Sequence, residues 1–254
     1  MTGRPYVLAE TTWKSVRETH YDVAILPWGA TEAHNYHLPY GTDNVETEAI
    51  ALEAARIAWE SGAKVIVLPT IPLGVNTQQL DITLTLNLNP STQALVLADL
   101  ARALSGQGIP KLLVLNGHGG NDFRQMIREL QVGVDMFICT LNWFTLFSWD
   151  EHFEKPGDHA GELETSLMLH LAPQLVMPLS EAGTGAARSF RIGALRDRWA
   201  WAPRQWTRVT DDTGVGDPSH AAADKGQRFF GDVTAKIAGF LTELANADTS
   251  DLYE

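Results

Sequence analysis

Cysteine and long apolar runs are almost absent from this sequence. Cys139 is the only cysteine, so no disulfide can form within the chain, and its place in the apolar run 137–139 predicts a small core residue. No stretch approaches the roughly 18 consecutive apolar residues that a membrane-spanning helix needs. The first residues also lack the apolar stretch of a secretory signal peptide. We therefore expect a cytoplasmic protein that binds no membrane.

Basic residues are scarce as well. The chain has 19 Lys and Arg against 31 Asp and Glu, which gives a formal net charge of -12. A nucleic-acid partner requires a clustered Lys/Arg surface, and no such cluster is present. The acidity is therefore read as an aid to solubility. With 254 residues, 44% of them hydrophobic, the chain can bury a sizeable core. It shows no repeat, low-complexity tract or linker, so we expect one domain over residues 1–254.

Short apolar, β-branched runs alternate with helical patterns along the chain. This alternation predicts an α/β fold with a mainly parallel central sheet that is covered on both faces. Ser91, which follows Pro90, is the expected N-cap of one helix. Strands are expected at residues 23–27, 64–69, 111–116 and 135–141, and helices at 46–61, 92–107, 121–131, 161–171 and 224–247.

Two segments interrupt the alternation. Within residues 76–90, apolar and polar side chains alternate over 82–88, which predicts an exposed or edge strand. Residues 180–220 are rich in Gly, Arg, Trp and Pro and have no clear period. We interpret them as a long functional loop or an excursion into a subunit interface.

Three polar segments follow expected strands. They contain Glu32, His34 and Asp43, then His118, and then His159. Ligands of open α/β sheets bind beyond the carboxyl ends of the strands, so we expect these segments to converge. Together they offer a ligand set for one or two divalent ions. Carboxylates and imidazoles suit Zn, Mn or Fe, and a water bound there becomes a usable nucleophile near neutral pH.

The first segment places Glu32 and His34 two residues apart in a loop. In an extended stretch both side chains can face one ion or two adjacent ions. Asp43 can reach back to them, and its two oxygens could bridge a pair of ions. Taken alone, a solvated acidic loop explains this segment equally well. His37 is interpreted as a loop histidine.

The second segment surrounds His118 with three glycines at a strand-to-helix turn, in the order Asn116-Gly117-His118-Gly119-Gly120-Asn121. Such a backbone must bend sharply or approach a ligand closely. Asn121 could cap the following helix, and neighbouring amides could hold negative charge that develops on a substrate oxygen. A phosphate cradle is the alternative, but the P-loop lysine and the spacing of a dinucleotide motif are missing.

The third segment leads into a helix through His159, which could protonate a leaving group. Glu162 and Glu164 are two residues apart, which on a helix puts them on different faces. We therefore expect one to face the metals and the other to make a supporting hydrogen bond. The alternative is a helix N-terminus that carries acidic residues because the helix dipole favours them.

Five motifs together resemble the creatininase (creatinine amidohydrolase) family in order and spacing. The resemblance covers the chain from about residue 6 to residue 240 and implies a three-layer α/β/α fold with a two-metal site. It also implies hydrolysis of a C–N bond in a small cyclic or formyl amide, and a homo-oligomer, commonly a hexamer. The motifs are residues 26–34, 39–43, 116–121, 159–166 and 214–218.

The resemblance also assigns metal ligands. By position, Glu32 and His118 look like ligands of one ion, His34 like a ligand of the other, and Asp43 like the bridge between them. In creatininase itself the second ion takes a glutamate two residues after the glycine-flanked histidine. That place is Gly120 here, so the missing ligand must come from elsewhere.

The third segment supplies the candidates for that ligand. Glu162 is the first candidate and Glu164 the second. His159 matches the histidine that is proposed to shuttle a proton in the family, and we assign Glu164 to catalysis together with it.

Departures from the family pattern affect the substrate. Family members often carry a Ser-x-Glu-His-like stretch after the second strand, whereas this chain has Asn76-Thr77-Gln78-Gln79. Creatinine is therefore a doubtful substrate. Other family branches resemble formamide deformylases or peptide-processing hydrolases. The same site could instead cleave a lactone or a cyclic ketone, and a catalytically silent ligand-binding or assembly protein is the remaining alternative.

Trp143 and Trp149 could wall a pocket, lie in a subunit contact or pack in the core. The expected substrate contacts are Asn76, Gly119, Trp143, Trp149 and Asp158.

Overall fold

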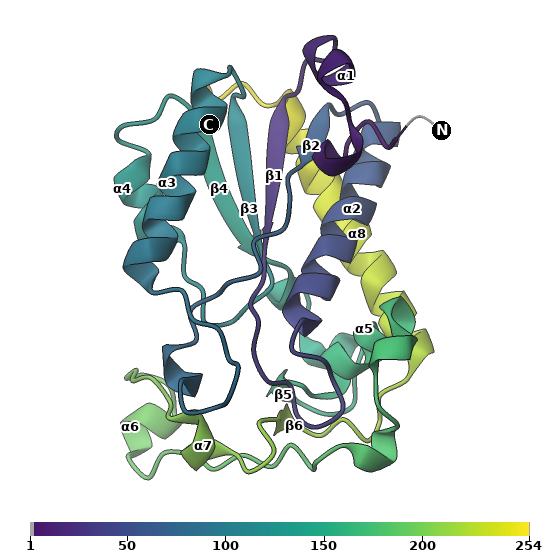
Figure 1. The fold of residues 1–254 in the computed structure, drawn as a ribbon, viewed down its shortest axis with the longest axis vertical. Helices are drawn as coiled ribbons and strands as arrows, with labels where there is room; N and C mark the ends of the chain where they lie inside the picture. The colour runs from purple at the N-terminus through teal and green to yellow at the C-terminus, as the bar shows by residue number, and fades with distance from the viewer. Residues whose placement is uncertain (1–2, 254) are drawn as a thin grey trace.

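The computed structural model describes residues 3–253 and is built around a sheet of parallel strands (Figure 1). The strands lie in the order β2-β1-β3-β4, and each neighbouring pair is parallel. The mainly parallel sheet expected from the sequence is therefore confirmed. The strands are β1 (Val23–Trp28), β2 (Val65–Val67), β3 (Lys111–Asn116) and β4 (Phe137–Asn142).

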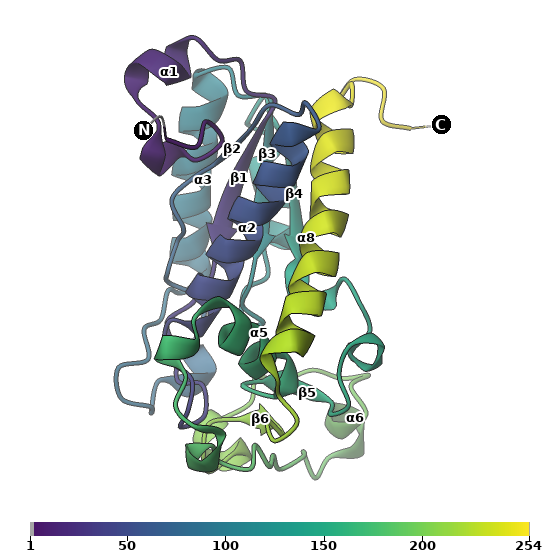
Figure 2. The same ribbon diagram turned by 90° about the vertical axis from the view of Figure 1, so that its right-hand side faces the viewer.

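Helices cover both faces of this sheet (Figure 2). The long helices α2 and α8 pack on one face, and α3 and α4 pack on the other, which gives the expected three layers. The α-helices are α1 (Trp13–Arg17), α2 (Thr42–Glu60), α3 (Pro90–Gly106), α4 (Arg124–Leu130), α5 (Glu162–Leu171), α6 (Gly193–Arg196), α7 (Trp206–Val209) and α8 (Ala223–Asn246). The 3₁₀ helices include η1 (Leu8–Glu10), η2 (Thr77–Gln79), η3 (Trp143–Thr145), η4 (Trp149–Glu151), η5 (Pro173–Leu175) and η6 (Leu179–Glu181).

The sequence of β1 explains why both faces are covered. Val23 and Ile25 pack in the core beneath α2 and α8. Ala24, Leu26 and Trp28 pack in the core beneath α3 and α4. Successive side chains of a strand point to opposite faces, so a continuous apolar run fits a strand that is buried on both sides.

Two helix starts differ from the expected ones. α2 begins at Thr42 rather than at residue 46, so Asp43 lies in its first turn, where the helix dipole favours a carboxylate. α3 begins at Pro90, and Asn89 occupies the N-cap position, so the assignment of Ser91 as the cap is wrong. Proline suits the first helical position because its missing N–H would have no partner there.

α4 begins at Arg124 instead of residue 121, so Asn121 does not cap it. The Asn121 side chain ties together loops at the end of the sheet. Its Oδ1 accepts from the backbone N–H of Val75 at 3.0 Å, and its Nδ2 donates to Oδ1 of Asn116 at 2.9 Å.

The strand expected over residues 82–88 is wrong. Residues 82–84 form a bend and a turn, residues 85–88 have no regular secondary structure, and Leu84 adopts a left-handed conformation with φ of 63°. Hydrogen bonds that involve the side chains of Asn76 and Asn87 hold the two ends of residues 76–87 together. The backbone N–H of Asn76 donates to Oδ1 of Asn87 at 2.8 Å, and Nδ2 of Asn76 donates to the carbonyl of Leu86 at 3.0 Å. Local alternation of residue types cannot reveal such asparagine bonds.

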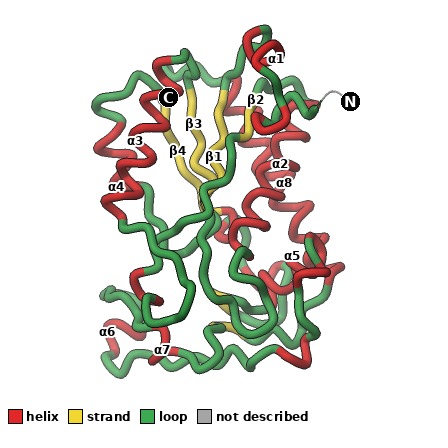
Figure 3. The backbone as a smooth tube through the Cα atoms, in the orientation of Figure 1, coloured by secondary structure: helices red, strands yellow, loops and turns green. Residues whose placement is uncertain are grey.

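Loops gather at one end of the molecule, beyond the carboxyl ends of β1, β3 and β4 (Figure 3). The segment 180–220 lies there and contains α6, α7 and the short strand β6 (Val215–Gly216). β6 pairs antiparallel with β5 (Gly157–His159). Within residues 3–253, no helix combines the length and the apolar character needed to cross a membrane.

Gly216 shows why the 214–218 motif requires glycine. Its φ is 143°, and a Cβ at this position would lie 2.8 Å from Cα of Gly157. The two backbones can therefore touch only because neither residue carries a side chain. This close contact positions β5, which ends in His159.

Candidate metal centre

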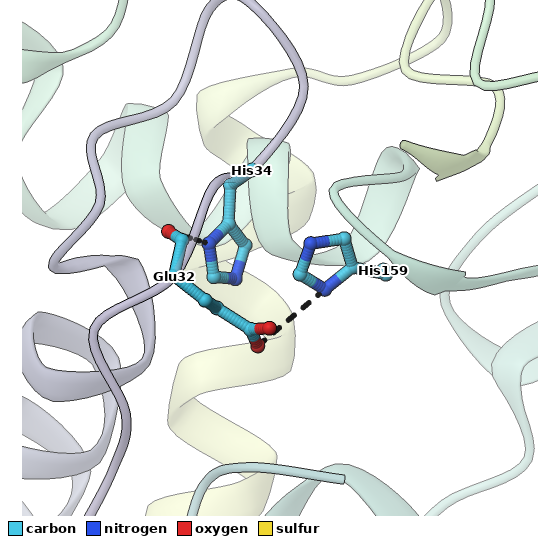
Figure 4. Close-up of side chains that lie close together, drawn as sticks. All are labelled: Glu32, His34 and His159. Carbon is cyan, nitrogen blue, oxygen red and sulfur yellow. Dashed lines mark hydrogen bonds and ion pairs between the residues drawn. The ribbon is translucent and has the colours of Figure 1, made fainter. Parts of the chain in front are cut away.

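The loops after β1 and β3, together with the end of β5, bring four of the expected site residues together. Glu32 and His34 follow β1, His118 follows β3, and His159 ends β5. All four side chains are buried. Figure 4 shows Glu32 and His34 facing His159, which comes from a distant part of the chain. The convergence expected from their places after the strands therefore occurs in the structure.

Asp43 lies at the centre of this cluster. Its Oδ1 is 2.8 Å from Nε2 of His34, and its Oδ2 is 2.9 Å from Nδ1 of His118. Oε1 of Glu32 is 2.8 Å from the same nitrogen of His118, and Oε1 of Glu164 is 3.9 Å from Nε2 of His34. The ligand atoms form three groups, Glu32–Asp43–His118, His34–Asp43–Glu164 and Glu32–His34–His159, each within 4.8 Å. Asp43 belongs to the group of His118 and also to that of His34 and Glu164, so its carboxylate joins the two.

Two of these close atoms lack good hydrogen-bond geometry. Within residues 3–253, neither Nε2 of His34 nor Oδ2 of Asp43 has a hydrogen-bond partner with acceptable geometry. Buried polar atoms normally have such partners. Atoms that converge without pairing suit a cation placed between them.

The histidine tautomers agree with this interpretation. Nδ1 of His34 lies 3.1 Å from the carbonyl oxygen of Glu32, and Nε2 of His118 lies 3.1 Å from that of Val75. A carbonyl oxygen only accepts hydrogen bonds, so these ring nitrogens carry the hydrogen. The opposite nitrogens point at Asp43, as in histidines whose second nitrogen binds a metal. The residues therefore fit a pair of divalent ions.

The electrostatics of the cluster also favour a cation. Burial disfavours the charged form of His34, but the nearby Asp43 carboxylate outweighs it and raises the pKa of His34 to about 10. Burial likewise opposes the charge on His118, yet Glu32 and Asp43 raise its pKa well above the usual value. The carboxylates thus hold protons on both rings, and a divalent ion would compete for the same positions.

Glu162 does not join the cluster. Its Oε1 accepts from Nζ of Lys225 at 2.5 Å, and its Oε2 accepts from the backbone N–H groups of Glu154 and Lys155 at 2.9 and 2.7 Å. Glu164 is the glutamate that faces His34. The two glutamates have different environments, as their spacing predicts. The sequence favoured Glu162 as the residue that faces the metals, whereas in the structure Glu164 lies beside the cluster.

Gly120 has no room for any side chain. A Cβ there would lie 2.4 Å from Nε2 of His118 and 2.2 Å from the carbonyl oxygen of Val75. The position that carries a metal-binding glutamate in creatininase therefore contributes no ligand in this chain.

His159 is oriented by its own backbone contact. Its Nε2 lies 2.7 Å from the carbonyl oxygen of Ala33, so this nitrogen carries the hydrogen. Nδ1 then faces Oε1 of Glu32 at 3.8 Å, and the ring centre lies 4.1 Å from that of His34. Trp206 packs edge-on against the ring at 5.2 Å. His159 can thus hold a proton at Nδ1 beside the cluster.

A cavity of about 1120 Å³ opens over the cluster. Among the expected substrate contacts, Gly119, Trp149 and Asp158 line it. Asn76 and Trp143 do not. Asn76 is buried and holds the 76–90 segment, and Trp143 is buried in the core with its Nε1 donating to Thr47 at 3.1 Å. The spacing of Trp143 and Trp149 in the sequence does not indicate which of the two rings faces a cavity.

Several residues near the cluster were not identified from the sequence as part of the site. Glu46 lies one turn after Asp43 on α2, is fully buried and has no hydrogen-bond partner for either oxygen within residues 3–253. The three-residue spacing was a signal that both carboxylates share a helix face. His37 lies in a loop as expected, but its side chain is buried, and burial lowers its pKa to about 4. Gln79 binds Glu32, and nothing in its local sequence indicates this.

The family model for creatinine amidohydrolase matches residues 9–241. The chain belongs to the creatininase family. A candidate creatinine amidohydrolase from Bacteroides fragilis NCTC 9343 is 44% identical in sequence, with a TM-score of 0.92 over 98% of this chain and 99% of that one. This chain, a creatininase-family hydrolase, is also 26% identical to the mycofactocin precursor peptide peptidase of Mycobacterium ulcerans (strain Agy99), over 88% of this chain and 82% of that protein. A creatininase variant of the Zn-Zn type is 24% identical over 95% of this chain and 99% of its own, with a TM-score of 0.73, and this likeness supports the shared fold.

Proposed function

We propose that this protein is a metal-dependent amidohydrolase that cleaves a C–N bond of a small cyclic amide or formamide. The observation that carries the proposal is the position of Asp43, which directs one oxygen to His34 and the other to His118. A shared carboxylate between two nitrogen ligands suits two divalent ions of the Zn, Mn or Fe type.

The chain offers ligands for both ions. Glu32 and His118 would hold one ion, and His34 would hold the other together with Glu164. Asp43 would bridge them. Glu164 thus replaces Glu162, because Glu162 is already bound to Lys225 and to two backbone amides. When bound, such ions polarise a carbonyl and lower the pKa of water to roughly 7.

The reaction adds the oxygen of water to the amide carbonyl carbon and breaks the C–N bond, so a proton must reach the departing nitrogen. We assign this proton transfer to His159. Its Nε2 hydrogen is held by the carbonyl of Ala33, which leaves Nδ1 free to take and give a proton next to Glu32. The backbone at Gly119, which lines the cavity, would contact the substrate.

A peptide bond is the second candidate for the bond that is cleaved. Pockets for drug-sized ligands occupy about 300–1000 Å³. The cavity here is about 1120 Å³, larger than a single small ring requires. Aromatic side chains of Phe144, Trp149 and Trp201 line it and could hold an extended substrate. The peptidase from Mycobacterium ulcerans supports this alternative, because a peptide bond is also an amide C–N bond.

The test is a substrate panel with the metal-free protein reloaded with Zn, Mn or Fe. The panel contains creatinine, formamides, small lactams, short peptides and a lactone, and Asp43→Asn is the matched variant. We expect hydrolysis of at least one amide that depends on the added ion and is lost in Asp43→Asn. Cleavage of the lactone alone would favour the ester alternative. A protein that binds no ion and hydrolyses nothing would be a silent ligand-binding or assembly protein.

We also propose that the protein forms a homo-oligomer, as the family resemblance implies. Exposed aromatic side chains support this. Trp199 and Trp201 are 78% and 85% exposed in the segment 180–220. Burying large apolar groups of this kind drives association. Light scattering on the purified protein would show a single monomer mass if this is wrong.

A further inference from the structure

The two oxygens of the Glu32 carboxylate have different partners. Oε1 lies 2.8 Å from Nδ1 of His118, in the group that would hold one ion. Oε2 accepts a hydrogen bond from Nε2 of Gln79. Both Glu32 and Gln79 are 1% exposed, so water does not compete for this bond.

Gln79 reaches Glu32 from a braced segment. It ends η2, and its backbone N–H donates to the carbonyl of Asn76 at 2.9 Å. Asn76 in turn binds Asn87 and Leu86 across the segment 76–90. The Gln79 amide is therefore presented to Glu32 by a backbone that the hydrogen bonds of Asn76 hold in place.

The amide orientation follows from chemistry. The carboxylate of Glu32 only accepts hydrogen bonds, so the NH₂ group of Gln79 must face it. This contact engages Oε2 and restrains rotation of the carboxylate, which leaves Oε1 directed at His118 and at the ion. A neutral donor does this without cancelling the negative charge that attracts a cation. A lysine or arginine at the same place would cancel it.

We propose that Gln79 is a positioning residue that holds Glu32 in its metal-binding orientation. The inference rests on the proposed metal centre. If Gln79 has this role, the segment 76–90 contributes to metal affinity. The same segment also lines the cavity through Gln79. Partners of this kind typically change metal affinity by about 10- to 100-fold when they are removed.

The test measures metal affinity and needs no substrate. Metal-free protein competes with a chromophoric chelator for Co²⁺ or Zn²⁺, and the Co²⁺ absorption spectrum reports the ligand geometry. Gln79→Met keeps the size of the side chain and removes the donor. Gln78→Met is the matched control, because Gln78 also lies in η2 and lines the cavity, whereas the bond to Glu32 comes from Gln79. Gln79→His restores an N–H donor.

We expect Gln79→Met to bind one of the two ions about 10- to 100-fold more weakly, with a changed Co²⁺ spectrum. Gln78→Met should match the wild type, and Gln79→His should recover most of the lost affinity. Wild-type affinity and spectrum in Gln79→Met would overturn the inference and leave the proposed function intact. Equal losses in Gln79→Met and Gln79→His would also overturn it, because they indicate a general packing role. A wild-type protein that binds no ion would overturn the proposed function as well.

Discussion

Nε2 of His34 lies 2.8 Å from Oδ1 of Asp43, and both side chains are buried. The Asp43 carboxylate outweighs the effect of burial and raises the pKa of His34 to about 10. At neutral pH the metal-free protein therefore keeps a proton where the lone pair of Nε2 would bind an ion. Metal and proton compete for one atom.

This competition predicts that metal binding releases protons. The imidazole must lose its proton before it can act as a ligand, so affinity falls as the pH is lowered, by up to about tenfold per pH unit for each proton released. This pH dependence of metal affinity continues up to the raised pKa of His34, about 10. Calorimetric titration with Zn²⁺ in buffers of different ionisation enthalpy, at several pH values from 6 to 8, measures the number of protons. Binding that releases none would contradict the assignment of His34.

Glu162 and Glu164 should respond differently to the same substitution. Glu164→Gln removes a carboxylate that faces His34, so we expect one ion to bind more weakly while the fold is kept. Glu162→Gln removes the partner of Lys225 in a place where the Glu162 side chain is fully buried. Lys225 keeps its partner Glu154, so we expect the weakened contact to cost about 1–3 kcal/mol of unfolding free energy. Urea unfolding combined with metal analysis separates the two effects. Loss of metal in Glu162→Gln at unchanged stability would restore the assignment made from the sequence.

Gly119 and Gly120 provide a matched pair of glycine-to-alanine changes. A Cβ at Gly120 would meet His118 and Val75 at 2.4 and 2.2 Å, whereas nothing lies within 4 Å of a Cβ at Gly119. Gly120→Ala should therefore displace His118, weaken metal binding and cost about 1–3 kcal/mol of stability. Gly119→Ala should leave stability within roughly 0.5 kcal/mol of the wild type. Thermal unfolding with and without metal measures both, and equal behaviour of the two variants would contradict the packing around His118.

Cys139 should be chemically inert in the folded protein. It lies half-buried in β4, and burial raises the pKa of its thiol to about 12. Because the thiolate is the reactive form, its fraction stays very small below that pH. We expect a thiol reagent to label the native protein at pH 8 only very slowly, and to label it at once in denaturant. Rapid labelling of one thiol per native chain would contradict the burial of this residue.

Much of the fold follows from local sequence. Apolar runs such as residues 111–116 end in polar loops, and this is sufficient to predict the parallel sheet and the convergence of Glu32, His118 and His159. The strand expected at 82–88 failed because Asn76 and Asn87 bind backbone and side-chain groups across the segment. Such hydrogen bonds form only once the chain has folded back on itself, and the spacing of residue types along the sequence does not indicate them.

The site could be predicted only in part for a similar reason. The spacing of Glu162 and Glu164 shows that they face different directions. Which of them faces the ions depends on Lys225, which comes from α8, more than 60 positions later in the chain. Gln79 likewise meets Glu32 through a loop whose path no local pattern indicates. Residues that support the ligands are therefore harder to find from sequence than the ligands themselves.

The number of ions bound per chain, measured on the wild type and on Asp43→Asn, tests the metal centre most directly. Metal-free protein is titrated with Zn²⁺ or Mn²⁺ against a chelator, and bound metal is counted by elemental analysis after removal of excess ion. We predict two tightly held ions per wild-type chain and weakened binding of both in Asp43→Asn, because one carboxylate serves the two sites. A wild-type chain that holds no ion, or an Asp43→Asn variant that holds two as tightly as the wild type, would contradict the shared metal centre.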